Sequence, residues 1–169
     1  IAEMPVVNGQ IRTDISRDIL KVAAVDRRFS PGKTFSGFIR GFKMETGAVA
    51  ASGTWDTANI LIVGENEVDM ALAANRIRDL QGAVVVYGKG RVLAEIPLPI
   101  FGLMTELDIP NLVGKAFELS RTMQDLGFPF PDPLRTLATL TGAAIPFLRI
   151  SEEGLIDIKN GGKLDLYEA

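Results

Sequence analysis

The chain consists largely of short apolar runs that are separated by glycine, proline and polar residues. Runs at residues 48–52 and 59–63 are short and carry no charge, so they predict strands that are half or fully buried. Two more runs, at residues 83–87 and 91–96, also predict strands. Residues 88–90, Gly-Lys-Gly, separate these two runs and predict a hairpin turn rather than a phosphate-binding loop, because no Lys-Ser/Thr pair and no helix follow.

The segment between these strand pairs has the features of a helix. Asn66 is a suitable N-cap, and the acidic residues that follow favour the positive end of the helix dipole. Gly82 is placed to end the helix. We expect its apolar face to carry Val68, Leu72, Ile77 and Leu80.

Further elements flank this central stretch on both sides. Strands are predicted upstream at residues 20–25 and 34–42, and downstream at residues 147–150, 155–158 and 163–167. Two downstream helices are also predicted. The first begins near Asp108 and Pro110 and ends at Gly127, and the second begins at Asp132 and Pro133 and ends at Gly142. This order of elements predicts an α+β fold, with about three α-helices covering one face of a mostly antiparallel (mixed) β-sheet.

The longer downstream helix repeats apolar residues with a period of 3.6. We therefore expect the following side chains to face the sheet: Ile109, Leu112, Val113, Ala116, Phe117, Met123 and Leu126. The segment between this helix and the strand before it, residues 96–104, is apolar and contains two prolines, which predicts a loop. Either the helix buries this loop, or Leu98, Ile100 and Phe101 dock on another domain or on a second copy of the chain.

Composition narrows the class of protein. The chain has 169 residues, which suits a single domain at residues 20–169 preceded by an extended linker at residues 1–19. A net charge of -3 argues against a nucleic-acid partner, which would require a basic face. No apolar run approaches the roughly 20 residues of a membrane span, and the first residues do not resemble a signal peptide. We therefore expect a cytoplasmic protein without a membrane or nucleic-acid partner.

The absence of two residue types narrows the chemistry further. The chain contains no cysteine and no histidine, which excludes disulfides, thiolate catalysis, Ser-His-Asp catalysis and metal sites built on sulfur or imidazole. We expect no metal site and no cofactor in this chain. The chain also begins at Ile1 rather than at methionine, so we interpret it as the excised C-terminal domain of a longer protein.

The most varied polar segment lies between the first two central strands, at residues 54–59. Asp56, Thr57 and Asn59 could contact a substrate there, or Asp56 and Asn59 could simply hydrogen-bond their own turn, as such side chains commonly do. Trp55, the one tryptophan, could stack on a planar base or fill a domain interface. Both interpretations of each residue remain open.

Charged residues elsewhere offer weaker candidates. Glu95 lies inside an apolar strand, either as a functional carboxylate that points into a cleft or on the exposed side of a half-buried strand. Arg27, Arg28 and Lys33 form a basic loop that either binds an anion or is a solvated edge.

Several blocks, in consistent order, resemble the C-terminal domain of adenine deaminases, which are metal-dependent amidohydrolases. In the central stretch the blocks are TWDTANILIVG (54–64), EVDMALAANRI (67–77) and LAEIPLPIFGLM (93–104). Before it lie KVAAVDRR (21–28) and GFIRGFKMETGAVAAS (37–52), and after it lies PDPLRTLATLTGAAIPFLRISEEGLIDI (131–158). The resemblance covers nearly the whole chain, from about residue 21 to residue 166.

The resemblance implies a parent enzyme that hydrolyses adenine to hypoxanthine and ammonia. It further implies an upstream barrel domain that binds a divalent metal, Mn or Fe, and that packs on this chain. The substrate-side candidates are then Trp55, Asp56, Thr57, Asn59 and Glu95.

The chain departs from the family at the central turn. The family usually reads Ala-His-Asp-Ser-His-Asn where this chain has Thr54, Trp55, Asp56, Thr57, Ala58 and Asn59, so both histidines are replaced. Arg28 likewise stands where the family often has histidine. Two alternatives therefore stay open: a domain of a paralogue that does not deaminate adenine, or a free-standing small-molecule binding module.

Overall fold

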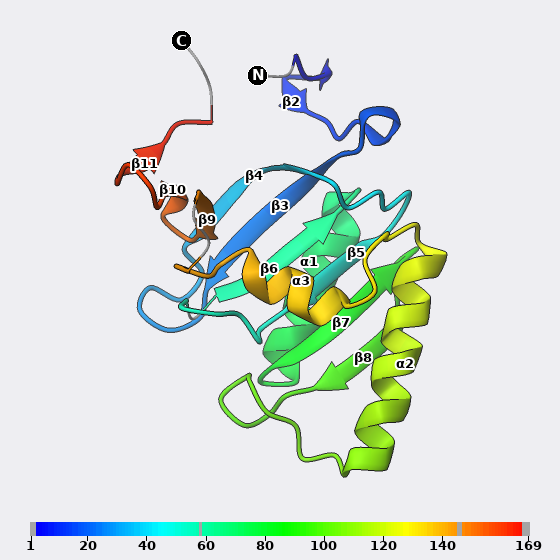
Figure 1. Ribbon diagram of the computed structural model, residues 1–169. Helices are drawn as coiled ribbons and strands as arrows, with labels where there is room; N and C mark the ends of the chain where they lie inside the picture. Colours follow the sequence, from blue (N-terminus) through cyan, green and yellow to red (C-terminus); the bar gives the residue numbers. More distant parts are fainter. Residues whose placement is uncertain (1–2, 58, 145–146, 167–169) are drawn as a thin grey trace.

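A computed structural model describes residues 3–57, 59–144 and 147–166 and centres on a six-stranded antiparallel sheet (Figure 1). Its strand order is β4-β3-β6-β5-β7-β8, and every neighbouring pair is antiparallel. The strands are β3 (Ile19–Asp26), β4 (Thr34–Arg40), β5 (Ala48–Ala51), β6 (Asn59–Gly64), β7 (Ala83–Gly88) and β8 (Arg91–Pro97).

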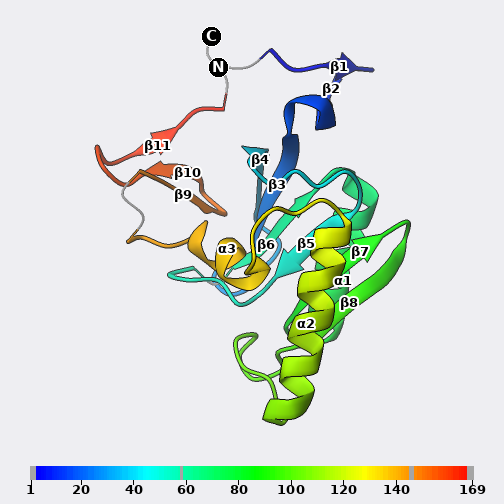
Figure 2. The ribbon, with the colours of Figure 1, turned by 45° about the vertical axis from the view of Figure 1, so that its right-hand side comes forward.

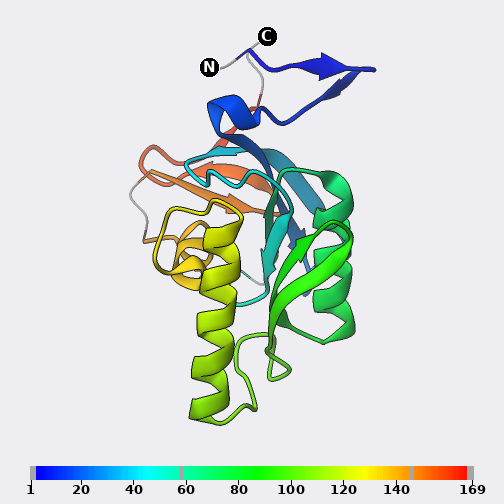
Figure 3. The same cartoon turned by 90° about the vertical axis from the view of Figure 1, so that its right-hand side faces the viewer.

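Three α-helices cover this sheet. They are α1 (Glu67–Asp79), α2 (Ile109–Asp125) and α3 (Pro133–Thr139). The predicted α+β class and the antiparallel sheet are confirmed, but the expectation that the helices share one face is wrong. Figure 3 shows α1 on one face of the sheet and α2 with α3 on the other. The central strands are apolar on both sides and therefore need cover on both faces.

The two faces carry separate cores. One core lies between the sheet and the helices α2 and α3, where Leu61 and Val63 share a cluster with Leu119 and Met123. The other lies under α1 and has fewer buried residues, several of them alanines such as Ala50 and Ala73.

The predicted helix ends are confirmed by their hydrogen bonds. Asn66 accepts from the backbone N–H of Asp69 at 2.8 Å, and Asp108 and Asp132 cap α2 and α3 in the same way at 2.9 Å. Gly82, with φ of 141°, follows α1, where an added Cβ would collide with the backbone of Leu98.

The predicted face of α1 is only partly correct. Ile77 is buried and Leu80 is partly buried, but Val68 faces solvent and Met70 occupies the core instead. Asp69 also faces inward, because its carboxylate accepts hydrogen bonds from the backbone N–H groups of Lys89 and Gly90. This carboxylate fixes the hairpin between β7 and β8, so the turn interpretation of residues 88–90 is confirmed.

The predicted apolar face of α2 includes some residues that the structure leaves exposed. Met123 is buried, and Leu112, Ala116 and Leu126 are partly buried against the core. The exposed fraction is 77% for Ile109 and 74% for Phe117, and Val113 is also exposed. These three residues lie four apart on the flank of the helix, beyond the surface that the sheet covers.

Smaller elements lie at the two ends of the chain. A three-stranded sheet of β9 (Leu148–Ser151), β10 (Gly154–Asp157) and β11 (Lys163–Leu164) follows α3, as Figure 2 shows. The first described residues form a hairpin of β1 (Val6–Val7) and β2 (Gln10–Ile11) and a 3-10 helix (Ile15–Arg17). No helix among the described residues combines the length and the apolar character that crossing a membrane requires.

Candidate functional site

Three of the predicted site residues line one cavity of about 980 Å³. Asp56, Thr57 and Asn59 form its wall together with Thr54. The other walls come from the loop between β3 and β4, the loop after β8, and the start of the β9–β10 sheet. Their lining residues are Arg27, Arg28, Phe29, Phe101, Leu103, Arg149, Ser151, Glu152, Glu153 and Ile156.

The turn at residues 54–59 is held internally by Thr54. Its hydroxyl lies 3.2 Å from the carbonyl oxygen of Thr57 and 3.0 Å from that of Asn59, so it can donate to either. Asp56 adopts a left-handed φ of 57°, which an aspartate tolerates better than most residues. Among the described residues, the turn is therefore closed locally by the Thr54 hydroxyl and by the backbone hydrogen bond from Thr57 N–H to the carbonyl oxygen of Trp55.

Asp56 and Asn59 instead connect the turn to distant parts of the chain. The Asp56 carboxylate accepts from the backbone N–H of Ala143 at 2.7 Å. The Asn59 amide donates to the Glu152 carboxylate at 2.9 Å, and Asn59 is almost fully buried. Thr141 adds a third link, because its hydroxyl donates to the carbonyl oxygen of Trp55 at 2.6 Å. Between described residues, the hydrogen bonds of the Asp56 and Asn59 side chains therefore lead out of the turn.

The neighbouring loop is organised by a buried carboxylate. Asp26 accepts from the backbone N–H groups of Arg28 at 2.7 Å, of Phe29 at 3.2 Å and of Ser30 at 2.6 Å. The hydrogen bond from Arg28 is the main reason that the pKa of Asp26 is lowered. This carboxylate shapes the loop that presents Arg27 and Arg28 to the cavity.

Arg27 is held between this loop and the loop after β8. Its guanidinium donates to the carbonyl oxygen of Phe101 at 2.8 Å, and burial lowers the pKa of the Arg27 side chain. Gly102 packs so closely against the guanidinium that an added Cβ would lie 2.7 Å from it. Ser52 donates to the carbonyl oxygen of Gly102 at 2.7 Å, so two hydrogen bonds hold the consecutive carbonyl groups of Phe101 and Gly102 within this turn.

Phe101 is presented outward by this arrangement. It has a left-handed φ of 55°, which is uncommon for a bulky residue, and its exposed fraction is 79%. Of the three residues predicted to dock on a partner, Phe101 alone is strongly exposed. Leu98 is partly buried against the core and Ile100 is also partly buried.

Two predicted candidates lie outside this cavity. Trp55 is half exposed and lines an adjacent groove of about 740 Å³ together with Leu98, Leu103 and Leu134. Glu95 pairs instead with Arg76 of α1, through two hydrogen bonds of 2.8 Å, and this pairing lowers the pKa of Glu95. Glu95 thus joins β8 to α1 and does not meet the other candidates.

The sequence offered no signal for some residues of the cavity. Arg149 lies in a short terminal strand, and Glu152 reads as a solvated turn residue, yet both line the cavity. Nothing in their local patterns distinguishes them, because the β9–β10 segment reaches the 54–59 turn only through tertiary folding. Arg27 and Arg28 were indicated by the basic loop, whereas Lys33 of that loop pairs with Glu153.

A metal centre does not fit the donor set. The chain has no histidine or cysteine. In the described parts of the chain, no three Asp or Glu side chains are grouped closely enough to hold a metal ion. The carboxylates in the cavity already accept hydrogen bonds from Ala143, Asn59 and Lys33.

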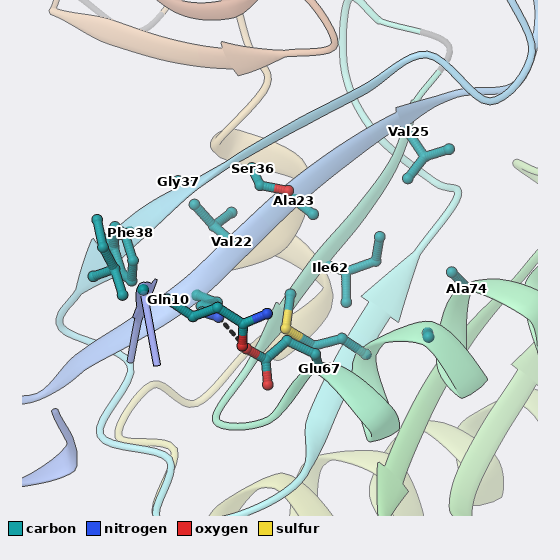
Figure 4. Close-up of a pocket in the computed structure, with 15 residues that line it drawn as sticks. Gln10, Val22, Ala23, Val25, Ser36, Gly37, Phe38, Ile62, Glu67 and Ala74 are labelled. Carbon is teal, nitrogen blue, oxygen red and sulfur yellow. Dashed lines mark hydrogen bonds and ion pairs between the residues drawn. The ribbon is translucent and has the colours of Figure 1, made fainter. Parts of the chain in front are cut away.

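A second cavity of about 620 Å³ lies beside α1, on the face of the sheet that this helix covers (Figure 4). Its lining is mainly small and apolar, with Ala23, Ile62 and Ala74 along it and Gln10 at one end. The Lys21–Glu67 ion pair lies at its edge. None of the predicted site residues lines it, so the 980 Å³ cavity is the better candidate site.

Comparisons with known proteins all find similarity to the same family. The chain matches the model of the adenine deaminase C-terminal domain over residues 1–162. It is 39% identical over 160 residues to an adenine deaminase of Kosmotoga olearia, covering 95% of this chain and 28% of that protein. It is 39% identical over 163 residues to an adenine deaminase of Moorella thermoacetica, covering 96% and 27%. For an adenine deaminase of Brucella melitensis the identity is 38% over 151 residues, covering 89% and 26%.

These relatives are much longer than the chain. The chain spans only about a quarter of the length of each of them. The match therefore concerns one domain, and it includes the residues of the candidate cavity up to Ile156.

Proposed function

The chain belongs to the adenine deaminase C-terminal domain family, and we propose that it serves as this domain in a hydrolase that converts adenine and water to hypoxanthine and ammonia. The observation that carries the proposal is the match of residues 1–162 to that domain. In this proposal an upstream barrel domain, which is a partner outside this chain, binds a divalent metal, Mn or Fe, that activates water. This chain lacks histidine and cysteine, and its described residues contain no group of three Asp or Glu side chains that could hold such a metal.

The role proposed for this chain is to support the barrel domain and to line the approach to its active site. The surface around the cavity suits this role, because Phe101, Leu103 and Trp55 are exposed there. Exposed apolar side chains that gather at one place commonly mark an interface. Thr57, Asp56 and Asn59 would then face the substrate side, with Trp55 at the domain interface.

Other parts of the proposal concern organisation. We propose that residues 1–19 link the domain at residues 20–169 to the upstream part of the protein, and that the protein is cytoplasmic. A homo-oligomer through the loop after β8 would involve Phe101 rather than Leu98, because Leu98 packs against the core.

A second candidate function is a paralogue that does not deaminate adenine. The observation that favours it is the replacement of two motif histidines by Trp55 and Ala58, together with Arg28 at a position where the family often has histidine. Of these positions, Arg28 lines the cavity and Trp55 lines the adjacent groove. Such a change would alter the charge that the domain presents to a substrate.

An ammonia-release assay separates the two candidates. The full-length protein, supplied with Mn or Fe, should release ammonia from adenine, whereas the 169-residue chain alone should release none. Metal-loaded full-length protein that binds its metal but leaves adenine unchanged would favour the paralogue. Turnover by the isolated chain would contradict both candidates, because it would place the reaction centre within this domain.

A further inference from the structure

The outer flank of α2 carries a row of exposed apolar side chains. Ile109, Val113 and Phe117 lie four residues apart, so they follow one another along the same side of the helix. All three are exposed, and Ile109 and Phe117 strongly so. Figure 2 shows α2 in front of the sheet, with no other described element across its outer side. These three residues are called the α2 row below.

The residues beside the α2 row allow another helix to approach closely. Pro110 and Gly114 are exposed, and each directly follows a residue of the row. Gly114 has no side chain, and a Cβ added there would meet nothing within 4 Å. Small residues at a helix surface let two helix axes lie near the short end of the usual separation of about 8–10 Å. The row is therefore accessible to the apolar side chains of a second helix.

Charges of opposite sign lie at the two ends of the α2 row. Arg121 continues the row by one further turn, and Glu106 lies just before the helix begins. Both are exposed, and neither forms an ion pair with any residue in the described ranges. The acidic residues within α2, Glu118 and Asp125, lie about 120–140° around the helix from Val113. A second α2 in the antiparallel orientation therefore brings unlike charges together at both ends, whereas a parallel one brings like charges together.

We propose that the α2 row is a contact between two copies of the protein, whose α2 helices pack antiparallel about a twofold axis at Val113. Ile109 and Phe117 each lie about 6 Å along the helix from Val113, one on either side. The twofold axis therefore places Val113 against Val113 of the second copy, and Ile109 against its Phe117. Arg121 lies about 12 Å along the helix from Val113, near the level of Glu106 of the second copy. The antiparallel orientation also aligns the two helix dipoles favourably.

The size of the surface matches a weak dimer. The α2 row and the exposed residues beside it, which are Pro110, Gly114, Arg121 and Gln124, offer roughly 500 Å² on each copy, since one large aromatic side chain can bury about 150–250 Å². Two copies together then bury roughly 1,000 Å², which is at the lower limit for a specific interface. We therefore expect a dissociation constant in the micromolar range.

This contact goes beyond the proposed function. The barrel domain is proposed to pack around the 980 Å³ cavity and the adjacent groove, and no residue of the α2 row lines either of them. The upstream domain and a second copy therefore have separate surfaces on this chain. A cross-linking experiment without adenine or metal tests the contact independently of the deaminase proposal.

The test places a thiol at the proposed twofold axis of the full-length protein. This chain contains no cysteine, so Val113→Cys introduces the one thiol of the domain. A short bismaleimide should then link two copies into a covalent dimer. Glu118→Cys is the matched control, because Glu118 is also exposed on α2 but lies on another side of the helix, and it should yield at least tenfold less dimer. A mixture of Ile109→Cys and Phe117→Cys should link to each other more than either variant links to itself.

Sedimentation velocity over a range of protein concentrations measures the strength of the contact. Phe117→Gln removes an exposed ring from each copy and should raise the dissociation constant at least tenfold. Arg121→Glu should also weaken the dimer, and Arg121→Glu/Glu106→Arg should restore it, because the double variant exchanges the two charges.

Three results would overturn the proposal. The first is equal cross-linking of Val113→Cys and Glu118→Cys. The second is association of the full-length protein that Phe117→Gln leaves unchanged, because the α2 row would then not hold the copies together. The third is a Val113→Cys thiol that does not react with a maleimide in the monomeric full-length protein, because the upstream domain would then cover the row.

Discussion

The hydrogen bond between Asn59 and Glu152 provides a direct test of how the candidate site is built. Asn59 is almost fully buried at the start of β6, and its amide donates to the Glu152 carboxylate at 2.9 Å. Hydrogen bonds to charged groups contribute about 1.5–3 kcal/mol. We therefore expect Asn59→Ala to lower the free energy of unfolding by about 2 kcal/mol. For a chain of this size, the Tm should then fall by about 4–8 °C.

A double-mutant cycle isolates this contact from other effects of the substitution. Glu152→Ala removes the acceptor, and the double variant Asn59→Ala/Glu152→Ala should be less destabilised than the sum of the single variants by about 1–2 kcal/mol. Urea denaturation followed by circular dichroism measures each free energy. Asn75→Ala is a matched control, because Asn75 is exposed on α1 and its side chain makes no hydrogen bond to the rest of the described chain.

Two outcomes would refute the reasoning. If the effects of the two substitutions add, Asn59 and Glu152 do not interact, and the turn is not held by this contact. If Asn59→Ala costs no more than Asn75→Ala, Asn59 has no structural role and its burial serves another purpose.

Three further predictions concern charge, backbone conformation and surface exposure. Glu95→Gln should destabilise the protein by less than about 1 kcal/mol near neutral pH, because Arg76 is partly exposed. Arg76 lowers the pKa of Glu95, so the stabilisation by this ion pair is present above the unfolded pKa of about 4.3 and is lost as the pH falls through the lower folded value. Urea denaturation of both proteins at several pH values measures this stabilisation. A difference in stability between wild type and Glu95→Gln that stays constant down to about pH 3 would contradict the prediction. Phe101→Gly should raise the free energy of unfolding by up to about 1 kcal/mol, since glycine adopts the left-handed φ of this position without strain, and a decrease would show that the exposed ring stabilises the loop. Phe117→Gln should change the free energy of unfolding by less than about 0.5 kcal/mol, because Phe117 is exposed. Leu119→Gln, two residues away and fully buried, should unfold or strongly destabilise the protein. Similar decreases in Tm for the two variants would show that Phe117 is not a surface residue.

Much of the fold follows from local patterns in the sequence. The strands β3 to β8 and the helix starts are predicted because apolar runs, N-cap side chains and terminal glycines each leave a local signal. Asn66, Asp108 and Asp132 illustrate this, because the same side chain that marks a helix start in the sequence caps that helix in the structure.

The errors arise where tertiary contacts decide the outcome. Asp69 turns inward because a hairpin twenty residues later supplies two N–H groups, and no local pattern contains that information. Ile109, Val113 and Phe117 have the spacing of a buried face, but the sheet ends before it reaches them. Periodicity shows which residues share a face, but it does not show how much of that face another surface covers.

The candidate site was predictable only in part for the same reason. The turn at residues 54–59 is conspicuous in the sequence because it combines several polar residues between two apolar strands. Arg149 and Glu152 complete the cavity from a segment about ninety residues away, and their local sequence is that of an ordinary turn and strand. Glu95 is as suitable a site residue in the sequence as those of the 54–59 turn, but in the structure its side chain pairs with Arg76 of α1.

The hydrogen bonds of the 54–59 turn explain how this chain keeps the family fold with a different set of side chains. Thr54 closes the turn, and Asp56 and Asn59 tie it to Ala143 and Glu152, so none of these bonds requires an imidazole. The two positions where the family usually has histidine, Trp55 and Ala58, do not supply side chains to these bonds. The hydrogen bonds that hold the turn therefore do not depend on the side chains at these two positions. A shared fold at this turn consequently says little about whether the activity is shared.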